Sequence, residues 1–105
     1  MKRIAWIGLG ALASVAMAHA GAADGKALFA SKCLTCHGPN GEGKPAIAKM
    51  LNATMRPLGS KEVQARSDAE IKATIGKGQG KMKPVAGLSA SDTDDVVGFV
   101  RTLKP

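Results

Sequence analysis

Apolar residues recur at helical spacing in several short stretches of the chain, the first of which begins near Asp24. Leu28 and Phe29 fall on a common face of this stretch, and Asp24 is of a residue type that caps helix N-termini. The pattern predicts a first helix over residues 24–34. No stretch alternates between apolar and polar residues at period two, so we expect almost no sheet.

Two further helices are predicted from their capping residues. Ser67 and Glu70 form a capping box, in which each side chain accepts from the other residue's free backbone N–H, and Gly76 is expected to end the short helix that follows. A last helix is predicted from Ser91, with three aspartates in its first turn, where the helix dipole favours negative charge. Its apolar face consists of Val96, Val97, Phe99, Val100 and Leu103.

The segments between these helices are rich in turn-forming residues. Residues 38–45 and 76–88 are dense in Gly, with Pro and Lys, and are expected to be loops. Residues 46–60 are ambiguous, because apolar residues at near-helical spacing are interrupted by residues such as Asn52 and Pro57. The predicted fold class is all-α, with short helices and long loops.

The N-terminus has the layout of a secretory signal peptide. Lys2 and Arg3 precede a long uncharged run, which contains a small-residue Ala-His-Ala cleavage site. We expect residues 1–20 to be removed, with cleavage as late as position 23 allowed, leaving residues 21–105 as one exported domain. An uncleaved membrane anchor is disfavoured, because Gly, Ser and His residues dilute the apolar run.

The composition of this exported domain poses a packing problem. It has two Phe and no Tyr, and Trp6 leaves with the signal peptide. A domain this small, with so few bulky aromatic residues, needs a staple or a cofactor at its centre. The only two cysteines are three positions apart, and a disulfide between them would restrain little of the chain. We therefore expect a cofactor to complete the core.

The segment Cys33-Leu-Thr-Cys36-His37 offers the chemistry for such a cofactor. Cys-x-x-Cys-His is typical of covalent haem attachment, in which two thiols bond one porphyrin edge and the adjacent imidazole ligates the iron. In a dithiol oxidoreductase, we would expect a strand before the motif and a helix after it. A zinc site would need about four protein ligands. With His37 the only histidine after residue 20, one covalent haem c is favoured.

Methionine is the candidate for the other side of the iron, since no second histidine remains. Met50 and Met55 lie among apolar residues, where a methionine is commonly packing filler. Met82 lies between two lysines, in a loop where Gly78 and Gly80 allow the backbone to approach a flat ring closely. These neighbours favour Met82 as the distal ligand.

Residues 24–103 resemble the small monohaem class I c-type cytochromes of bacteria. The matching pieces are the Cys-x-x-Cys-His-Gly motif after a first helix, the Gly-rich loop, the capped short helix, the segment ending in Met82 and the capped last helix. The resemblance implies a class I cytochrome c-like fold wrapped around one covalently bound haem. It also implies that Cys33 and Cys36 bond this haem, and that His37 and Met82 are its axial ligands.

The resemblance carries two further expectations about packing. Gly25, Phe29 and Phe99 would form the crossing of the first and last helices. The backbone carbonyl of Pro45 is one candidate for the acceptor that orients His37.

A haem iron with both His and Met ligands has no vacant position for a substrate, and a neutral thioether favours the reduced state. The sequence therefore predicts an electron carrier and not an enzyme, acting in the periplasm between redox proteins. Two alternatives stay open. One is a fixed electron-transfer subunit of a larger oxidoreductase, and the other, less favoured, is a haem sensor or enzyme in which Met82 leaves the iron.

The chain is basic, with a formal charge of +7, of which Lys2 and Arg3 contribute two charges that leave with the signal peptide. Four lysines crowd the segment around Met82, and they form either an ordinary solvated surface or a basic rim that steers partners with acidic docking faces. They are Lys72, Lys77, Lys81 and Lys83. Nucleic-acid binding is disfavoured by export and by the lack of stacking aromatic residues. We expect a monomer without stable membrane insertion.

Overall fold

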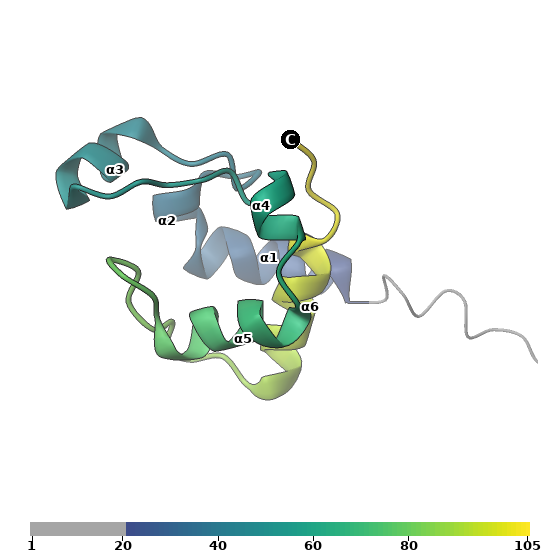
Figure 1. Ribbon diagram of the computed structural model, residues 1–105. Helices are drawn as coiled ribbons and strands as arrows, with labels where there is room; N and C mark the ends of the chain where they lie inside the picture. The colour runs from purple at the N-terminus through teal and green to yellow at the C-terminus, as the bar shows by residue number, and fades with distance from the viewer. Residues whose placement is uncertain (1–20) are drawn as a thin grey trace, which may run out of the picture.

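The computed structural model describes residues 21–105, which form six helices joined by loops (Figure 1). The helices are α1 (Ala22–Lys32), α2 (Leu34–His37), α3 (Pro45–Leu51), α4 (Lys61–Gln64), α5 (Asp68–Lys77) and α6 (Ala90–Val100). These residues contain no strand, only one isolated backbone bridge between Gln79 and Met82, which confirms the all-α class. The expected signal peptide, residues 1–20, lies outside the described residues.

The packing of α1 against α6 is the main tertiary contact of the fold. Gly25 lies where the helices approach most closely, since a Cβ at this position would collide with the carbonyl oxygen of Asp95 and would lie 3.1 Å from the Cβ of Phe99. The Phe29 ring, 2% exposed, stacks at a tilt on Phe99 with 5.1 Å between the ring centroids. The expected crossing through Gly25, Phe29 and Phe99 is confirmed.

The buried core is small and is built almost entirely from three helices. Its members are Phe29, Cys33, Ile71, Ile75, Val96, Val97, Phe99 and Val100, which come from α1, α5 and α6 apart from Cys33. By contrast, α2, α3 and α4 bury none of their residues. None of the helices described is long and apolar enough to span a bilayer.

Capping boxes set the starts of α5 and α6. At α5 both predicted bonds are present, because the N–H of Glu70 donates to Ser67 Oγ (3.1 Å) and the N–H of Ser67 donates to Glu70 Oε1 (2.8 Å). At α6 the box is made by Ser89 and Asp92, with bonds of 3.0 and 3.1 Å. The predicted start at Ser91 is therefore wrong, since the cap two residues earlier provides the reciprocal bonds.

The predicted ends of two other helices also need correction. The first helix begins at Ala22 with Gly21 at its cap, so Asp24 lies in the first turn and does not cap the helix. The predicted stop at Gly76 is wrong, because α5 continues to Lys77 and ends where Gly78 turns the chain with a φ of 81°. Only a residue without a Cβ adopts this backbone conformation readily, so Gly78 is the stronger stop.

Residues 46–60, ambiguous in the sequence, divide between a helix and an extended segment. Pro45 is the first residue of α3, where its missing N–H is not needed, and Asn52 ends the helix in the left-handed conformation with a φ of 52°. The short helix α4 was not predicted. It begins after Ser60, whose Oγ accepts from the N–H of Val63, and its four residues are too few for any periodicity.

Candidate functional site

The Cys-x-x-Cys-His motif forms one short turn directly after α1. The N–H groups of Cys36 and His37 both donate to the carbonyl of Cys33, at 3.2 and 3.0 Å, which folds the motif into α2. Cys33 is 8% exposed and belongs to the core, whereas Cys36 is exposed, and neither is in a disulfide. Backbone hydrogen bonds therefore hold Cys33, Cys36 and His37 on one short turn, with neither thiol in a disulfide.

Burial sets the charge of these groups. It raises the pKa of the Cys33 thiol, with a smaller contribution from Cys36, so this thiol is uncharged at neutral pH. Burial lowers the pKa of His37, so its imidazole is neutral, the form that ligates metals. His37 Nδ1 is buried without a hydrogen-bond partner. The suggested acceptor, the Pro45 carbonyl, therefore does not bond to it.

These properties fit the donor set of a c-type haem. The imidazole makes no Nδ1 hydrogen bond that would account for its burial as a structural group. Its ring centroid lies 6.5 Å from that of Phe29, which connects the motif to the helix crossing. A neutral imidazole beside two free thiols is what covalent attachment and iron ligation require.

The two rival interpretations of the motif lack structural support. A helix precedes the motif and a loop follows it, the reverse of the strand and helix expected of a dithiol oxidoreductase. Within residues 21–105, no three His, Cys, Asp or Glu side chains gather in a way that could hold a metal ion, so a protein-ligated zinc site has no ligand set.

Met82 lies in a tight reversal of the chain after α5, which we call the Met82 turn (residues 78–84). The N–H of Gln79 donates to the carbonyl of Met82 and the N–H of Met82 donates to the carbonyl of Gln79, both at 2.9 Å. Gly78 packs closely against the end of this turn, since a Cβ there would lie 2.6 Å from the Met82 carbonyl oxygen and 3.0 Å from Pro84 Cδ. The Met82 residue is partly buried.

The other two methionines occupy different environments. Met50, on α3, is 72% exposed, so its interpretation as packing filler is wrong. Met55 is partly buried beside the glycine-rich loop, where its Cγ and Sδ lie 3.6 and 3.7 Å from the point that a Cβ on Gly43 would occupy. Met55 therefore does fill space, as expected from the sequence.

The motif and the Met82 turn come from opposite halves of the chain. In the view of Figure 1 both are drawn toward the left, near the C-terminal end of α1, with α3 above them. Cys33, Cys36 and His37 are gathered by local backbone hydrogen bonds, whereas Met82 is placed by its own turn and by α5.

The four lysines around the Met82 turn are all exposed, but they are not equivalent. Lys72 Nζ lies 2.6 Å from Asp94 Oδ1, an ion pair that links α5 to α6. The hydrogen bond and the charge of Asp94 raise the pKa of Lys72. Lys72 therefore has a partner within the fold, and its charge is partly offset by Asp94.

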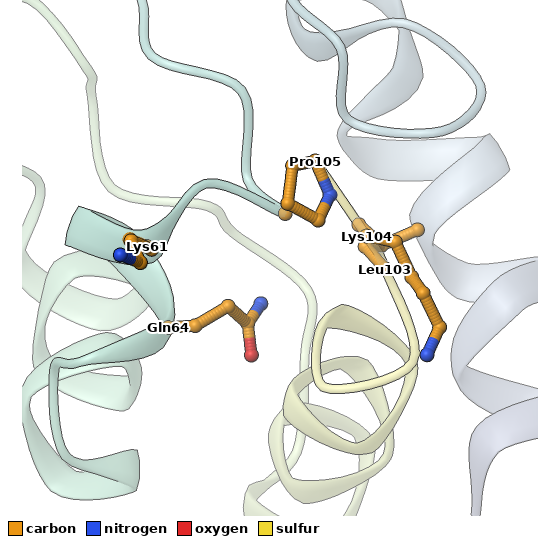
Figure 2. A pocket seen from close by; sticks show the side chains of 6 residues that line it. Lys61, Gln64, Leu103, Lys104 and Pro105 are labelled. Carbon is orange, nitrogen blue, oxygen red and sulfur yellow. The ribbon is translucent and has the colours of Figure 1, made fainter.

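A pocket of about 270 Å³ lies between α4 and the C-terminal residues (Figure 2). Its lining contains none of the predicted site residues and consists of Gly59, Lys61, Gln64, Leu103, Lys104 and Pro105. Figure 2 shows Lys104 and Pro105 on the C-terminal side of this pocket and Lys61 on α4.

Arg101 makes a set of long-range hydrogen bonds that the sequence did not indicate. Its guanidinium donates to the carbonyls of Gln64 (3.0 Å) and Arg66 (2.6 Å) and to the carboxylate of Asp68 (2.9 Å). These bonds connect the end of α6 to the last residue of α4, to the linker after it and to the first residue of α5. The partners are more than 30 positions apart in the chain, so no local pattern could have indicated them.

Comparisons with known proteins agree with this fold. The family model for cytochrome c matches residues 22–104. The chain is 32% identical over 89 residues to cytochrome c-554(547) of Halothiobacillus neapolitanus, which covers 79% of this chain and 97% of that protein. A solved structure, the KustC0563 c-type cytochrome, is 30% identical with a TM-score of 0.63 and covers 77% of this chain and 98% of its own. A mutant of that cytochrome gives 31% identity and a TM-score of 0.61.

The fold, the motif and these matches define the class as small c-type cytochromes with the class I fold. The chain belongs to the cytochrome c family. It is an electron-transfer protein that binds haem c covalently and exchanges electrons with redox partners. The bound haem supplies the one-electron chemistry of its iron, between Fe(III) and Fe(II).

Proposed function

We propose that the chain is an exported electron carrier in the periplasm, with Cys33 and Cys36 as the thioether residues and His37 and Met82 as the axial ligands. The observation that carries this proposal is the single turn of α2, which sets a neutral, partly buried imidazole beside two free thiols. A neutral imidazole has the lone pair that iron ligation needs, and the unlinked thiols are available for attachment.

Met82 is supported as the distal ligand by the way its backbone is held. Its turn is closed by two backbone hydrogen bonds, and the residue itself is partly buried. Met50 is largely exposed, and Met55 fills the space beside Gly43. A carrier needs a ligand that stays at one place during repeated oxidation and reduction, because each rearrangement would slow transfer.

With two axial ligands from the protein, no position on the iron is left for a substrate. This arrangement supports a carrier and not an enzyme. Ligand-binding spectra test the sensor or enzyme alternative, since a vacant or labile position binds small molecules at once. Co-purification tests the alternative of a fixed subunit in a larger oxidoreductase. The mass of the mature protein from the periplasmic fraction tests export and cleavage at residue 20.

Replacement of each methionine tests the ligand assignment. Met82→Ala should abolish the sulfur-to-iron charge-transfer band of the oxidised protein, lower the potential and open the iron to small exogenous ligands. Met50→Ala is the matched control, and it should keep the band and change the free energy of unfolding by less than about 0.5 kcal/mol, because the side chain is exposed. If Met55→Ala loses the band and Met82→Ala keeps it, the assignment of Met82 is wrong.

Lys77, Lys81 and Lys83 support a partner with an acidic docking face, since all three are exposed on or beside the Met82 turn. At about 0.15 M ionic strength, charges are screened beyond roughly 8 Å, so only lysines near the contact should steer association. Lys81→Glu should therefore slow bimolecular electron transfer and flatten its dependence on ionic strength. Lys104→Glu is the control, because this exposed lysine lies beside the C-terminal pocket (Figure 2). If the electron-transfer rate depends on ionic strength equally in the two variants, the lysines form an ordinary solvated surface and do not steer association.

A further inference from the structure

A chain of side-chain hydrogen bonds runs from Arg66 to the Met82 turn. Arg66 Nη2 donates to Thr74 Oγ1 at 3.0 Å, and Thr74 Oγ1 donates in turn to Gln79 Oε1 at 2.8 Å. The direction of each hydrogen bond agrees with the chemistry of its groups. A guanidinium only donates, a hydroxyl both accepts and donates, and an amide oxygen accepts. Thr74 is therefore the link between the Arg66 guanidinium and Gln79 of the Met82 turn.

Thr74 also holds the entry to the turn through its backbone. Its carbonyl accepts from the N–H of Gly78 at 2.8 Å, and the next carbonyl along α5, that of Ile75, accepts from the N–H of Val85 at 2.9 Å. Gln79 is the residue whose backbone pairs with Met82 on both sides. The last turn of α5 thus holds both ends of the Met82 turn, and the Thr74 hydroxyl reaches Met82 through a single intermediate residue.

The other end of this chain is fixed to the best-packed part of the fold. The carbonyl of Arg66 accepts from Arg101 Nη2 at 2.6 Å, and Arg101 follows directly after α6. In the turn itself, Gln79, Lys81 and Lys83 are exposed. Among the described residues, hydrogen bonds are therefore the main interactions that hold the turn, with Met82 itself partly buried.

We propose that Thr74, acting through Gln79, is a positioning residue that keeps the Met82 turn closed and so limits how often Met82 leaves the iron. This inference rests on the proposed ligation by Met82. Opening of the turn moves the Met82 backbone away from Gln79, and loss of the Thr74 hydroxyl removes one of the bonds that oppose this opening. The device lies on α5 and in the turn, outside the motif that binds the haem.

Thr74→Val tests the proposal in the intact holoprotein, because valine keeps the shape of the side chain and removes its hydroxyl. The rate of imidazole binding to the oxidised protein should rise about three- to tenfold, which corresponds to about 0.6–1.4 kcal/mol. Hydrogen exchange of the Met82 N–H, which donates to the Gln79 carbonyl, should rise by a similar factor. Thr74→Ser restores the hydroxyl and should return both rates toward those of the unmodified protein.

Thr93→Val is the matched control. Thr93 Oγ1 donates to the carbonyl of Ser89 at 3.0 Å near the start of α6, so this variant loses a comparable hydrogen bond that has no connection to the Met82 turn. It should change neither rate. If Thr74→Val exchanges the Met82 N–H no faster than Thr93→Val does, the proposal is overturned.

Two further measurements distinguish a failure of the positioning role of Thr74 from a failure of the proposed ligation by Met82. Gln79→Ala removes the acceptor from an exposed position without touching α5, and it should raise both rates as Thr74→Val does. A result in which Met82→Ala retains the charge-transfer band would show that the ligand assignment is at fault. A result in which Met82→Ala loses the band, while Thr74→Val and Gln79→Ala leave both rates unchanged, would show that the positioning role alone is at fault.

Discussion

The two sides of this molecule are held together in different ways. The crossing of α1 and α6 is packed side chain against side chain, with Phe29 on Phe99 and no room for a Cβ at Gly25. On the side that carries α2, α3 and the Met82 turn, Cys33 is the one buried hydrophobic residue among the described residues, and the shape of this side comes from backbone hydrogen bonds and glycine turns. The side with the crossing of α1 and α6 has a packed core of its own. The side with α2, α3 and the Met82 turn is a set of turns that lacks one.

This difference explains why a cytochrome of this size needs its cofactor to complete its core. A domain of this length buries a modest fraction of its surface, and here the protein's own core is confined to one helix crossing and α5. A haem bound at the proposed residues would add apolar surface on the other side, so its binding free energy would contribute to folding.

The largest effect should come from removing the attachment of the cofactor. Cys33→Ala with Cys36→Ala should lose most of the stability of about 5–15 kcal/mol typical of a folded domain, because the turns have no core of their own. Thermal unfolding followed by circular dichroism should show a broad transition without cooperativity. Thr35→Ala, an exposed change within the same motif, should keep the haem and the cooperative transition. A compact double variant that melts cooperatively without haem would contradict this view of the two sides.

The next largest effect should come from the helix crossing. Gly25→Ala places a Cβ against the backbone carbonyl of Asp95, which cannot move aside as a flexible side chain can, so α1 and α6 must separate. We expect a loss of about 3 kcal/mol in the free energy of unfolding, measured by urea denaturation of the holoprotein. Gly76→Ala is the opposite case, because no atom lies within 4 Å of its Cβ position on α5, and it should stabilise by about 0.5–1 kcal/mol. Similar losses in the free energy of unfolding in both variants would mean that α1 and α6 can accommodate a Cβ at position 25.

The smallest effect should come from the capping box of α5, whose two residues are exposed. Its bonds from the backbone and hydroxyl of Ser67 lower the pKa of Glu70 below the ordinary 4.5. The ionised carboxylate therefore stabilises the folded state fully above that ordinary value, and the contribution is lost as the pH falls through the lowered value. Glu70→Gln should be slightly less stable than the unmodified protein at pH 7, with the difference disappearing in acid. Glu62→Gln, an exposed change on α4, is the control, and an equal, pH-dependent loss there would contradict the capping explanation.

Much of this protein was predictable because its chemistry is local. Cys33, Cys36 and His37 are close in sequence, so their own backbone bonds place them on one turn whatever the rest of the chain does. The box of Ser67 and Glu70 is equally local, and both of its bonds form as predicted. Met82 was favoured through its glycine neighbours, and the turn they permit is present, although the ligation itself stays a prediction.

Tertiary structure determined the features that depend on contacts between distant residues or on a choice between two neighbouring cap residues. Ser89 and Ser91 are both cap residues, and only the reciprocal bonds with Asp92 select the first. The apolar character of Met50 suggested burial, but within residues 21–105 its side chain is 72% exposed on α3. Arg101 reaches partners more than 30 residues away, and the chain from Arg66 to Gln79 depends on that anchor. Such contacts exist only once the helices are packed, because hydrogen bonds between remote residues follow from how the elements are placed in space and not from any period in the sequence.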